Sequence, residues 1–552
     1  MKNRFFLLFI LWPVFFACNS ASKTQSADII IINAVVWTGD SLLPNATAIA
    51  LKENKIVYVG DNPDEFSSST TVTIDAGNRM ITPGIIDNHV HFLSGGYQLG
   101  SVDLRRANSK AEFVKIFGEY ARSTKAGRWI QGGDWDHEAM AEMPRRDWID
   151  SISTDNPVLV ARYDGHMALA NSKALKLAGI DRNTKDPEGG TILRDDSTGE
   201  PTGILKDAAM NLVYNVIPAP DSAELDEMFN RAQEHAISLG VTQVTDVNSF
   251  GGWTDLETYR RARRKNALKL RVYSLVQLGD WKKLEDYTKR NGKGDDLLFW
   301  GGLKGFVDGS LGSTTAWFYD PYLDEPGTSG LIITDTAKLR ADIIDANNAG
   351  LHVAVHAIGD RAIDWLLDVY ETAANEGKKR FRIEHAQHIS KSSVARFKSL
   401  KVIASVQPYH AIDDGRWAAK RLDNDRLLRT YAFRTLLDAG ATVTFGSDWT
   451  VAPFNPMEGI FAATFRQTLD GQNPGGWFPA EKLTVEESLQ CYTVNNAFAN
   501  FMEDKTGSLK AGKLADLVIW DTNILNASAD QIRNAKAWMT FIDGKKVFTQ
   551  ER

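Results

Sequence analysis

Apolar and polar residues alternate through the middle of the chain as they do in β-strands that are each followed by an amphipathic helix. Short runs rich in Val, Ile and Leu are separated by helical patterns such as residues 339–349 and 362–374. The predicted strands are 80–89, 241–247, 270–276, 302–307, 352–357, 380–385, 401–406 and 441–446. Eight buried strands with intervening helices predict an α/β fold, a (β/α)8 TIM barrel.

Both chain ends are richer in strand-like sequence than in helix. Short Ile- and Val-rich runs broken by Gly and Asn occur before residue 60 and return after residue 508. Neither end is large enough to bury a core alone, so we expect residues 28–80 and 507–550 to pair into one composite β-sandwich.

The barrel domain is then expected to occupy residues 81–506, with one long insertion after its first strand. Residues 103–234 are more than a single crossover helix needs. We expect this segment to be an inserted lid subdomain that covers the mouth of the barrel.

The first residues predict export. Lys2 and Arg4 precede an apolar run over residues 5–16, which is too short to span a bilayer comfortably. A small residue and then Cys18 follow, which resembles a bacterial lipoprotein signal. We therefore expect residues 1–27 to be a signal peptide and tether, with the protein lipid-anchored through Cys18 to a bacterial membrane, in the periplasm or at the cell surface. The alternative is an ordinary secretory signal.

Composition narrows the function classes. The 552 residues are 43% hydrophobic and 24% charged, as in an ordinary soluble globular protein. The net charge of −7 disfavours nonspecific nucleic-acid binding, so we expect no nucleic-acid partner and no membrane contact except through the lipid. If Cys18 carries lipid, Cys491 is the one cysteine left and no disulfide can form within the chain.

Histidines and a carboxylate lie at the ends of predicted strands, where barrel enzymes carry function. His89 and His91 end the first strand, and residues two apart in a strand face the same way. This pair alone would favour a structural role. His356, His385 and Asp448 end three further strands, and several buried polar groups of this kind are costly unless they share a ligand. A shared metal ion resolves that cost.

Lys304 lies inside the fourth apolar strand. Burial disfavours its ammonium form and lowers its pKa, and the neutral amine can add carbon dioxide to become a carbamate that bridges two metals. The alternative is a lysine that reaches solvent or pairs with Asp308.

A catalytic or substrate-contact role is predicted for His166, which lies in a Gly-containing turn of the predicted lid. The alternative is a loop histidine whose hydrogen bonds are satisfied locally.

Aromatic residues beside these motifs could form the wall of a pocket for a small uncharged or weakly charged amide, although aromatic residues more often only pack in the core. They are Trp129, Trp135, Trp449 and Phe454.

Together these motifs resemble the amidohydrolase superfamily, and within it amidohydrolase family 3, over residues 28–547. The motifs are Pro83-Gly-Ile-Ile-Asp-Asn-His-Val-His91, Asp164-Gly-His-Met-Ala-Leu-Ala-Asn171, Lys304 with Asp308-Gly-Ser-Leu-Gly-Ser313, His356-Ala-Ile-Gly-Asp-Arg361, Ile383-Glu-His-Ala-Gln387, Gly446-Ser-Asp-Trp449 and Gly507-Ser-Leu-Lys-Ala-Gly-Lys-Leu-Ala-Asp-Leu-Val518.

The resemblance implies a distorted barrel with a composite sandwich and one or two divalent ions, usually Zn2+. It implies two sets of ligands: His89, His91 and Asp448 for one ion, and His356 and His385 for the second, with N6-carboxylysine at Lys304 between them.

The expected reaction is hydrolysis of a carbon–nitrogen, non-peptide bond of amide type by metal-activated water, with Asp448 moving the proton. The alternatives are a deaminase or a lyase on the same metal site, or a catalytically inactive surface binding lipoprotein. The oligomeric state stays open, with a homodimer as one option.

Overall fold

The computed structural model describes residues 26–163, 165–373 and 380–551. Residues 1–25 of the predicted signal peptide and tether, Cys18 among them, lie outside the described residues. Within the described part, no helix combines the length and the apolar character that crossing a membrane requires.

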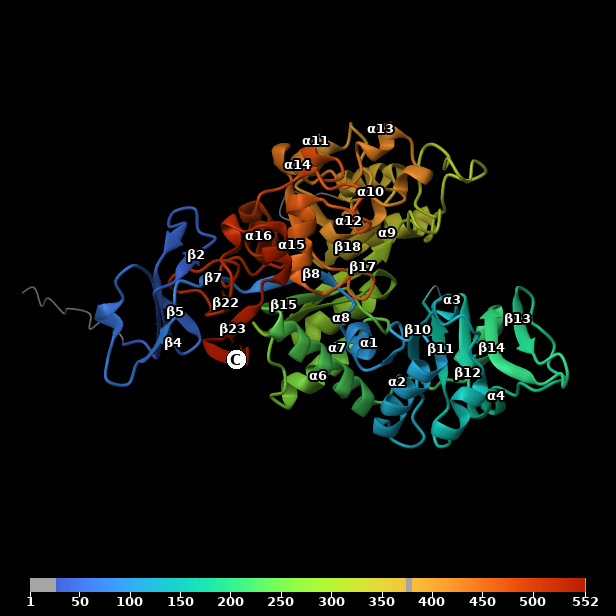
Figure 1. The fold of residues 1–552 in the computed structure, drawn as a ribbon. Helices are drawn as coiled ribbons and strands as arrows, with labels where there is room; N and C mark the ends of the chain where they lie inside the picture. Colours follow the sequence, from blue (N-terminus) through green and yellow to red (C-terminus); the bar gives the residue numbers. More distant parts are fainter. Residues whose placement is uncertain (1–25, 164, 374–379, 552) are drawn as a thin grey trace, which may run out of the picture.

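Eight parallel strands form the central sheet, and each overlaps one of the predicted barrel strands (Figure 1). The strands are β8 (Ile85–Val90), β15 (Val241–Asp246), β16 (Arg271–Gln277), β17 (Leu298–Phe306), β18 (His352–Ala357), β19 (Arg382–His385), β20 (Ile403–Val406) and β21 (Thr442–Phe445). They lie side by side in chain order from β8 to β21, and each neighbouring pair is parallel. The result is a nearly closed parallel barrel.

The seam between β8 and β21 is closed by individual hydrogen bonds rather than by a strand ladder. The Asn88 amide donates to the Thr444 hydroxyl at 2.9 Å, and the backbone N–H of Asp448 donates to the carbonyl of His89 at 2.8 Å. The seam therefore brings the first and last predicted site residues of the chain together.

Helices surround the barrel and bury their apolar faces against it, in a single large core that includes Ile343, Leu366 and Leu367. The helices of this part are α1 (Phe92–Leu99), α6 (Ser222–Ser238), α7 (Trp253–Arg264), α8 (Trp281–Asn291), α9 (Thr336–Asn348), α10 (Asp360–Ala373), α11 (Val394–Ser399), α12 (Pro408–Asp414), α13 (Asn424–Leu427), α14 (Phe433–Asp438), α15 (Pro456–Phe465), α16 (Val485–Tyr492) and α17 (Val494–Ala499).

The two chain ends share a six-stranded sheet of order β24-β23-β22-β7-β2-β3, beside a four-stranded sheet of order β5-β4-β1-β6. Ile49 of the smaller sheet and Ile519 of the larger one belong to one buried cluster. The strands are β1 (Ile29–Ile32), β2 (Val35–Trp37), β3 (Asn45–Ala46), β4 (Ala48–Lys52), β5 (Lys55–Gly60), β6 (Val72–Asp75), β7 (Met80–Pro83), β22 (Leu517–Trp520), β23 (Ala537–Ile542) and β24 (Lys545–Thr549), and α18 spans Ala529–Asn534.

The single first strand predicted over residues 80–89 is wrong. It is two strands in different sheets, β7 beside β22 and β8 beside β15, with Gly84 between them. A Cβ atom at Gly84 would lie 2.1 Å from the Thr242 hydroxyl oxygen, so the close approach of β15 requires glycine at this bend.

A buried arginine joins the barrel to the end sheet. Arg271, at the start of β16, donates Nε and Nη2 to the two carboxylate oxygens of Asp516 at 2.6 and 2.8 Å, and Nη2 also lies 2.6 Å from Asp543 Oδ1. Arg271 is completely buried, and Asp516 and Asp543 flank the C-terminal strands.

The segment between β8 and β15 carries a fourth sheet, of order β13-β14-β12-β11-β10-β9, with its own buried clusters. In Figure 1 this sheet lies to one side of the barrel. Its elements are β9 (Val102–Asp103), α2 (Lys110–Ser123), β10 (Gly132–Trp135), α3 (His137–Met140), β11 (Leu159–Arg162), β12 (Met167–Ala170), α4 (Ser172–Leu177), β13 (Gly190–Arg194), β14 (Pro201–Asp207) and α5 (Asn211–Tyr214). Helix α6, which overlaps the end of the predicted insertion, packs on α1 and contributes Leu225 and Phe229 to the barrel core. The lid role of residues 103–234 stays a prediction.

Candidate metal centre

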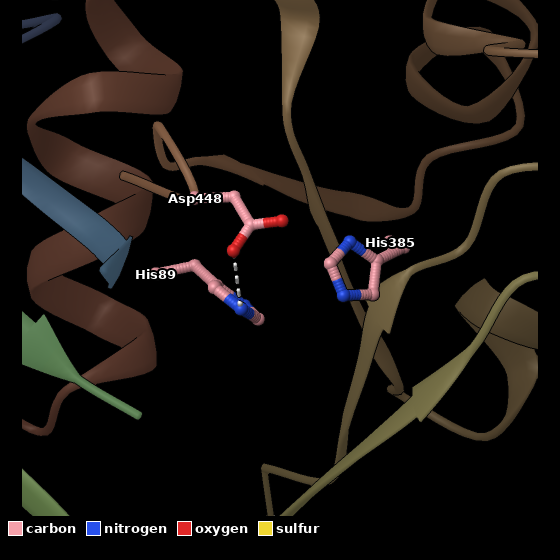
Figure 2. A group of neighbouring side chains, drawn as sticks. All are labelled: His89, His385 and Asp448. Atoms are coloured by element: carbon pink, nitrogen blue, oxygen red, sulfur yellow. Dashed lines mark ion pairs between the residues drawn. The ribbon is translucent and has the colours of Figure 1, made fainter. Parts of the chain in front are cut away.

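Two imidazoles and a carboxylate converge at the C-terminal ends of the barrel strands. His89, His385 and Asp448 are buried, and each offers a ligand atom within 4.8 Å of the other two. Figure 2 shows the three side chains turned toward one another, with His89 Nε2 3.6 Å from Asp448 Oδ1. This spacing leaves room for one cation between them.

The other predicted ligands surround this cluster. His91 Nε2 lies 3.4 Å from Asp448 Oδ1, and the ring centre of His356 lies 4.5 Å from that of His385. Lys304 is buried, and its Nζ lies 3.3 Å from His89 Nε2. The structure thus brings six side chains to one place, although they are up to 359 positions apart in the numbering (448 − 89).

Hydrogen bonds fix the orientation of the rings. In three of the histidines, Nδ1 contacts an oxygen that accepts its proton, which leaves the Nε2 lone pair directed at the cluster. The contacts are His89 Nδ1 to Glu384 Oε2 at 2.5 Å, His91 Nδ1 to the Asn248 carbonyl at 2.5 Å and His385 Nδ1 to Gln407 Oε1 at 2.7 Å. His356 is turned the other way: Nε2 donates to the Gly309 carbonyl at 2.9 Å and Nδ1 is left for a ligand.

Glu384 is itself held by a buried network. Arg382 donates Nε to Oε1 at 2.7 Å and Nη2 to Oε2 at 3.0 Å, and the Ser405 hydroxyl donates to Oε2 at 2.7 Å. Burial acts to raise the pKa of Glu384, but Arg382 and His89 outweigh it and hold that pKa well below its usual range. The carboxylate is therefore anionic and accepts the Nδ1 proton of His89.

Burial also keeps the imidazoles of His89, His356 and His385 neutral. Burial, with the neighbouring charge of Lys304, lowers the pKa of His89 to about 4 and that of His356 to about 3, and burial lowers the pKa of His385 well below 6.5. Burial lowers the pKa of Lys304 to about 8. Neutral imidazole is the form that binds metal ions.

The backbone turns sharply at the same strand ends. His385, Asp448 and Asn248 adopt positive φ angles of 72°, 58° and 72°. The left-handed region costs about 1–2 kcal/mol per non-glycine residue, and Asn, Asp and His are among the residues that enter it most readily. Strain of this kind is found at functional sites, where the surrounding structure compensates for it.

Lys304 does not pair with Asp308, the alternative that the sequence left open. The Asp308 carboxylate accepts backbone N–H groups of Trp317, Ile358 and Gly359 at 2.8–3.0 Å. Lys304 instead lies against His89, with 3.3 Å between Nζ and Nε2, and therefore contacts the cluster.

His166 has a different environment. It precedes β12 on the insertion, its side chain is 75% exposed, and its Nδ1 lies 2.8 Å from Asp207 Oδ1. The structure does not place it in the buried cluster, and its role as a catalytic or substrate-contact residue stays a prediction.

The residues of the predicted aromatic wall lie in different parts of the molecule. Trp135 belongs to the core of the insertion, whereas Trp449 and Phe454 stack in the barrel core with 4.7 Å between their ring centres.

His410 is a site residue that the sequence left unassigned. It lies on α12, and its Nε2 is 3.8 Å from Asp448 Oδ2, on the side of the carboxylate away from His91. This Nε2 is buried, and beyond that contact no hydrogen-bond partner is found for it in the part of the chain that the structure describes. Glu384 was also missed as a positioning residue, although it directly precedes His385 in the sequence.

The donor set fits a divalent metal of the zinc type. Neutral imidazole nitrogens with fixed tautomers and one anionic carboxylate share a small buried volume, and these are the ligands that zinc and its neighbours prefer. Several imidazole lone pairs that face one carboxylate at such distances are otherwise unfavourable in a buried site.

Comparison with known proteins agrees with this geometry. A family model described as amidohydrolase family matches residues 72–548. The chain is 39% identical over 538 residues to Protein LONG AFTER FAR-RED 3 of Arabidopsis thaliana, covering 95% of this chain and 92% of that one. It is 28% identical over 546 residues to an N-substituted formamide deformylase of Arthrobacter pascens, covering 94% and 98%.

A solved structure gives the same result. An uncharacterized metal-dependent hydrolase from Pyrococcus furiosus superposes with a TM-score of 0.76 at 30% sequence identity, covering 90% of this chain and all of that one. The matched residues span the barrel and, in the sheet that the two chain ends share, β7, β22, β23 and most of β24. The chain therefore belongs to the amidohydrolase family of metal-dependent hydrolases.

Proposed function

We propose that this protein hydrolyses a non-peptide carbon–nitrogen bond of amide type in a small molecule, with Zn2+ as the divalent ion. The observation that carries the proposal is the convergence of His89, His385 and Asp448 within 4.8 Å, with each ring held in the metal-binding tautomer. A bound divalent ion supplies Lewis acidity and lowers the pKa of a coordinated water from about 15.7 towards about 7.

Asp448 is the group proposed to move the proton. Burial acts to raise the pKa of Asp448, but the contact with His91 and the neighbouring His89 and His385 outweigh burial and hold that pKa well below its usual range, so the side chain is a carboxylate. Its Oδ1 faces His89 and His91, which leaves Oδ2 on the side of His410 to accept a proton and deliver it to the leaving nitrogen. General acid–base catalysis of this kind typically contributes about 10²–10⁴-fold.

Lys304 is proposed to be carboxylated. Its neutral nitrogen attacks the carbon of CO2, a C–N bond forms, one C=O electron pair moves to oxygen, and the nitrogen releases a proton to water. The buried site supports this step because the pKa of about 8 leaves part of the amine neutral near pH 7.5. The product is an anion that would hold metal beside His89 and His356. Carbon-13 NMR of protein equilibrated with labelled bicarbonate should show one carbamate resonance that is lost in Lys304→Arg.

The substrate is proposed to be a small amide, a class supported by the similarity to an N-substituted formamide deformylase. The experiment is a screen of N-acyl, formamide and cyclic-amide compounds with zinc-loaded protein. Carboxylate appearing with amine supports amide hydrolysis, whereas ammonia without a new carboxylate would identify a deaminase.

The matched variants are Asp448→Asn and, as a control, Asp438→Asn, an exposed carboxylate on α14. Asp448→Asn should lose about 10²–10⁴-fold in turnover and Asp438→Asn should lose none. An Asp448→Asn protein with full turnover would remove that residue from the mechanism.

Two further expectations remain proposals. We propose export and lipid attachment at Cys18, on the pattern of residues 1–27. Cys18→Ser should move the protein from the membrane fraction to the soluble fraction.

We also propose that the two sheets of residues 28–80 and 507–550 form one composite β-sandwich, since their buried residues share a cluster.

A further inference from the structure

A cavity of about 560 Å³ lies at the N-terminal end of the barrel strands, the end opposite the metal cluster. Phe299 of β17 and His352 of β18 line it, and the cluster residue His356 lies four residues further along β18. With a rise of about 3.3 Å per residue, the two positions are about 13 Å apart. The volume is within the range of about 300–1,000 Å³ that is typical of small-molecule sites.

Hydrogen-bonded side chains fill the barrel between this cavity and the cluster. Asn500 lines the cavity, and its Oδ1 accepts from the Thr245 hydroxyl at 3.1 Å. Thr245 also lies 3.1 Å from Asn88 Oδ1, which accepts from Arg382 Nη1 at 3.1 Å. All four side chains are buried. A molecule in the cavity therefore has no open path to the metal cluster and would be a second ligand rather than the substrate.

One wall of the cavity is a stack of aromatic rings. The rings of Phe299 and Tyr273 are nearly parallel, at 13° and 4.8 Å between centres, and those of Tyr273 and His352 at 9° and 5.8 Å. Phe501 meets His352 edge-on at 5.0 Å. A wall of this kind favours a planar aromatic ligand, which can stack on it or meet it edge-on.

The polar atoms of this wall already have partners. His352 Nε2 must donate to the Arg380 carbonyl, 2.8 Å away, because a carbonyl only accepts. Its Nδ1 then accepts from the Tyr273 hydroxyl at 2.9 Å. The wall therefore offers ring faces and edges to a ligand. Any polar group of the ligand must be recognised by another part of the cavity.

A single cation at the cavity lacks an acidic partner. The other charged residues that line it are paired: Arg380 with Glu503, Lys505 with Asp296 and Asp295 with Arg263. Lys293 donates to the Gly350 carbonyl at 2.9 Å, and no carboxylate of the described residues lies within ion-pair distance of it. An ammonium group beside an aromatic wall suits a ligand that carries one negative charge.

We propose that this cavity is a second small-molecule site, which takes a planar aromatic monoanion of the aryl carboxylate class. The ring system of the ligand lies against Phe299, and its carboxylate accepts a hydrogen bond from Lys293 Nζ. The charge and the aromatic wall act together, so a ligand that lacks either feature binds more weakly.

Isothermal titration of the full-length protein with 2-naphthoate tests this site, with neutral 2-naphthalenemethanol as the comparison ligand. We expect saturable 1:1 binding of the naphthoate and weaker binding of the alcohol. Lys293→Gln should weaken naphthoate binding about threefold to fivefold, and Lys293→Arg should restore it. Phe299→Ala should weaken both ligands about fivefold. Lys289→Gln, which removes an exposed charge from α8, is the matched control and should change nothing.

The same titration in Asp448→Asn locates the ligand, because a carboxylate can also bind a metal. Unchanged naphthoate affinity in this variant supports the separate cavity, whereas loss of binding would place the ligand at the metal cluster and overturn the proposal. Equal affinity of the acid and the alcohol, full affinity in Lys293→Gln, or no saturable binding would each overturn it as well.

Discussion

Replacing Glu384 with Gln tests whether the second carboxylate of the site works by holding His89. The substitution keeps the size of the side chain but removes the charge that accepts from His89 at 2.5 Å and from Arg382 at 2.7 and 3.0 Å. In the variant an amide N–H₂ group must face either the arginine or the histidine N–H. Donor then meets donor, whichever way the amide is turned.

Two magnitudes follow from the burial of these groups. Arg382 and Glu384 are completely buried, so breaking their pair should cost about 3–5 kcal/mol of unfolding free energy. Loss of the carboxylate that orients a metal-binding histidine typically weakens metal binding about 10–100-fold. Ser405→Ala is the matched control, since it removes one hydrogen bond to Glu384 Oε2 and leaves the charge, for about 1 kcal/mol.

The assay is zinc affinity, by competition with a chromophoric chelator, beside chemical denaturation of the metal-free proteins. We expect Glu384→Gln to lower both the zinc affinity and the stability, and Ser405→Ala to lower the stability with little change in zinc affinity. A Glu384→Gln protein that binds zinc as tightly as the wild type would show that Glu384 does not support metal binding through His89. This holds whatever the stability of the variant, because a purely structural role would leave metal affinity unchanged.

Three further predictions concern the frame of the site. Gly84→Ala should lower the stability by about 1–3 kcal/mol, seen as a lower melting temperature, because its Cβ would lie 2.1 Å from the Thr242 hydroxyl; an unchanged melting temperature would show that β15 yields easily. Arg271→Met should cost about 3–5 kcal/mol in urea denaturation, because it leaves Asp516 buried without its partner. Burial lowers the pKa of His352 to about 3, so the unfolded chain binds an extra proton there between about pH 6.5 and 3 and stability falls as the pH falls. His352→Gln should remove about 1.4 kcal/mol per pH unit of that dependence, and an unchanged slope would contradict the assignment.

Much of the barrel could be predicted because each strand is a local signal. The apolar runs that end at His356 and His385 are continuous in the sequence, and the structure places β18 and β19 there. The break at Gly84 could not be seen, since the runs on both sides of it are apolar and the reason for the bend is Thr242, which follows 158 residues later.

The candidate site was predicted as a set of residues but not as a geometry. Strand ends of a parallel barrel meet at one face, so ligand types at those ends indicate a common site. The partners that orient the rings could not be predicted, because they come from distant parts of the chain: the oxygen that holds His89 belongs to Glu384, and the one that holds His91 is a carbonyl of Asn248. His410 carries no distinguishing motif, and only the fold brings it to Asp448.

We infer that side chains far apart in the sequence share a divalent cation. The most direct test is elemental analysis of protein reconstituted with zinc and then dialysed, for the wild type and for His89→Ala with His385→Ala. We expect one or two zinc ions per wild-type chain and the loss of at least one in the double variant, with the fold checked by circular dichroism. A wild-type protein that retains no zinc, or a double variant that retains as much as the wild type, would contradict it.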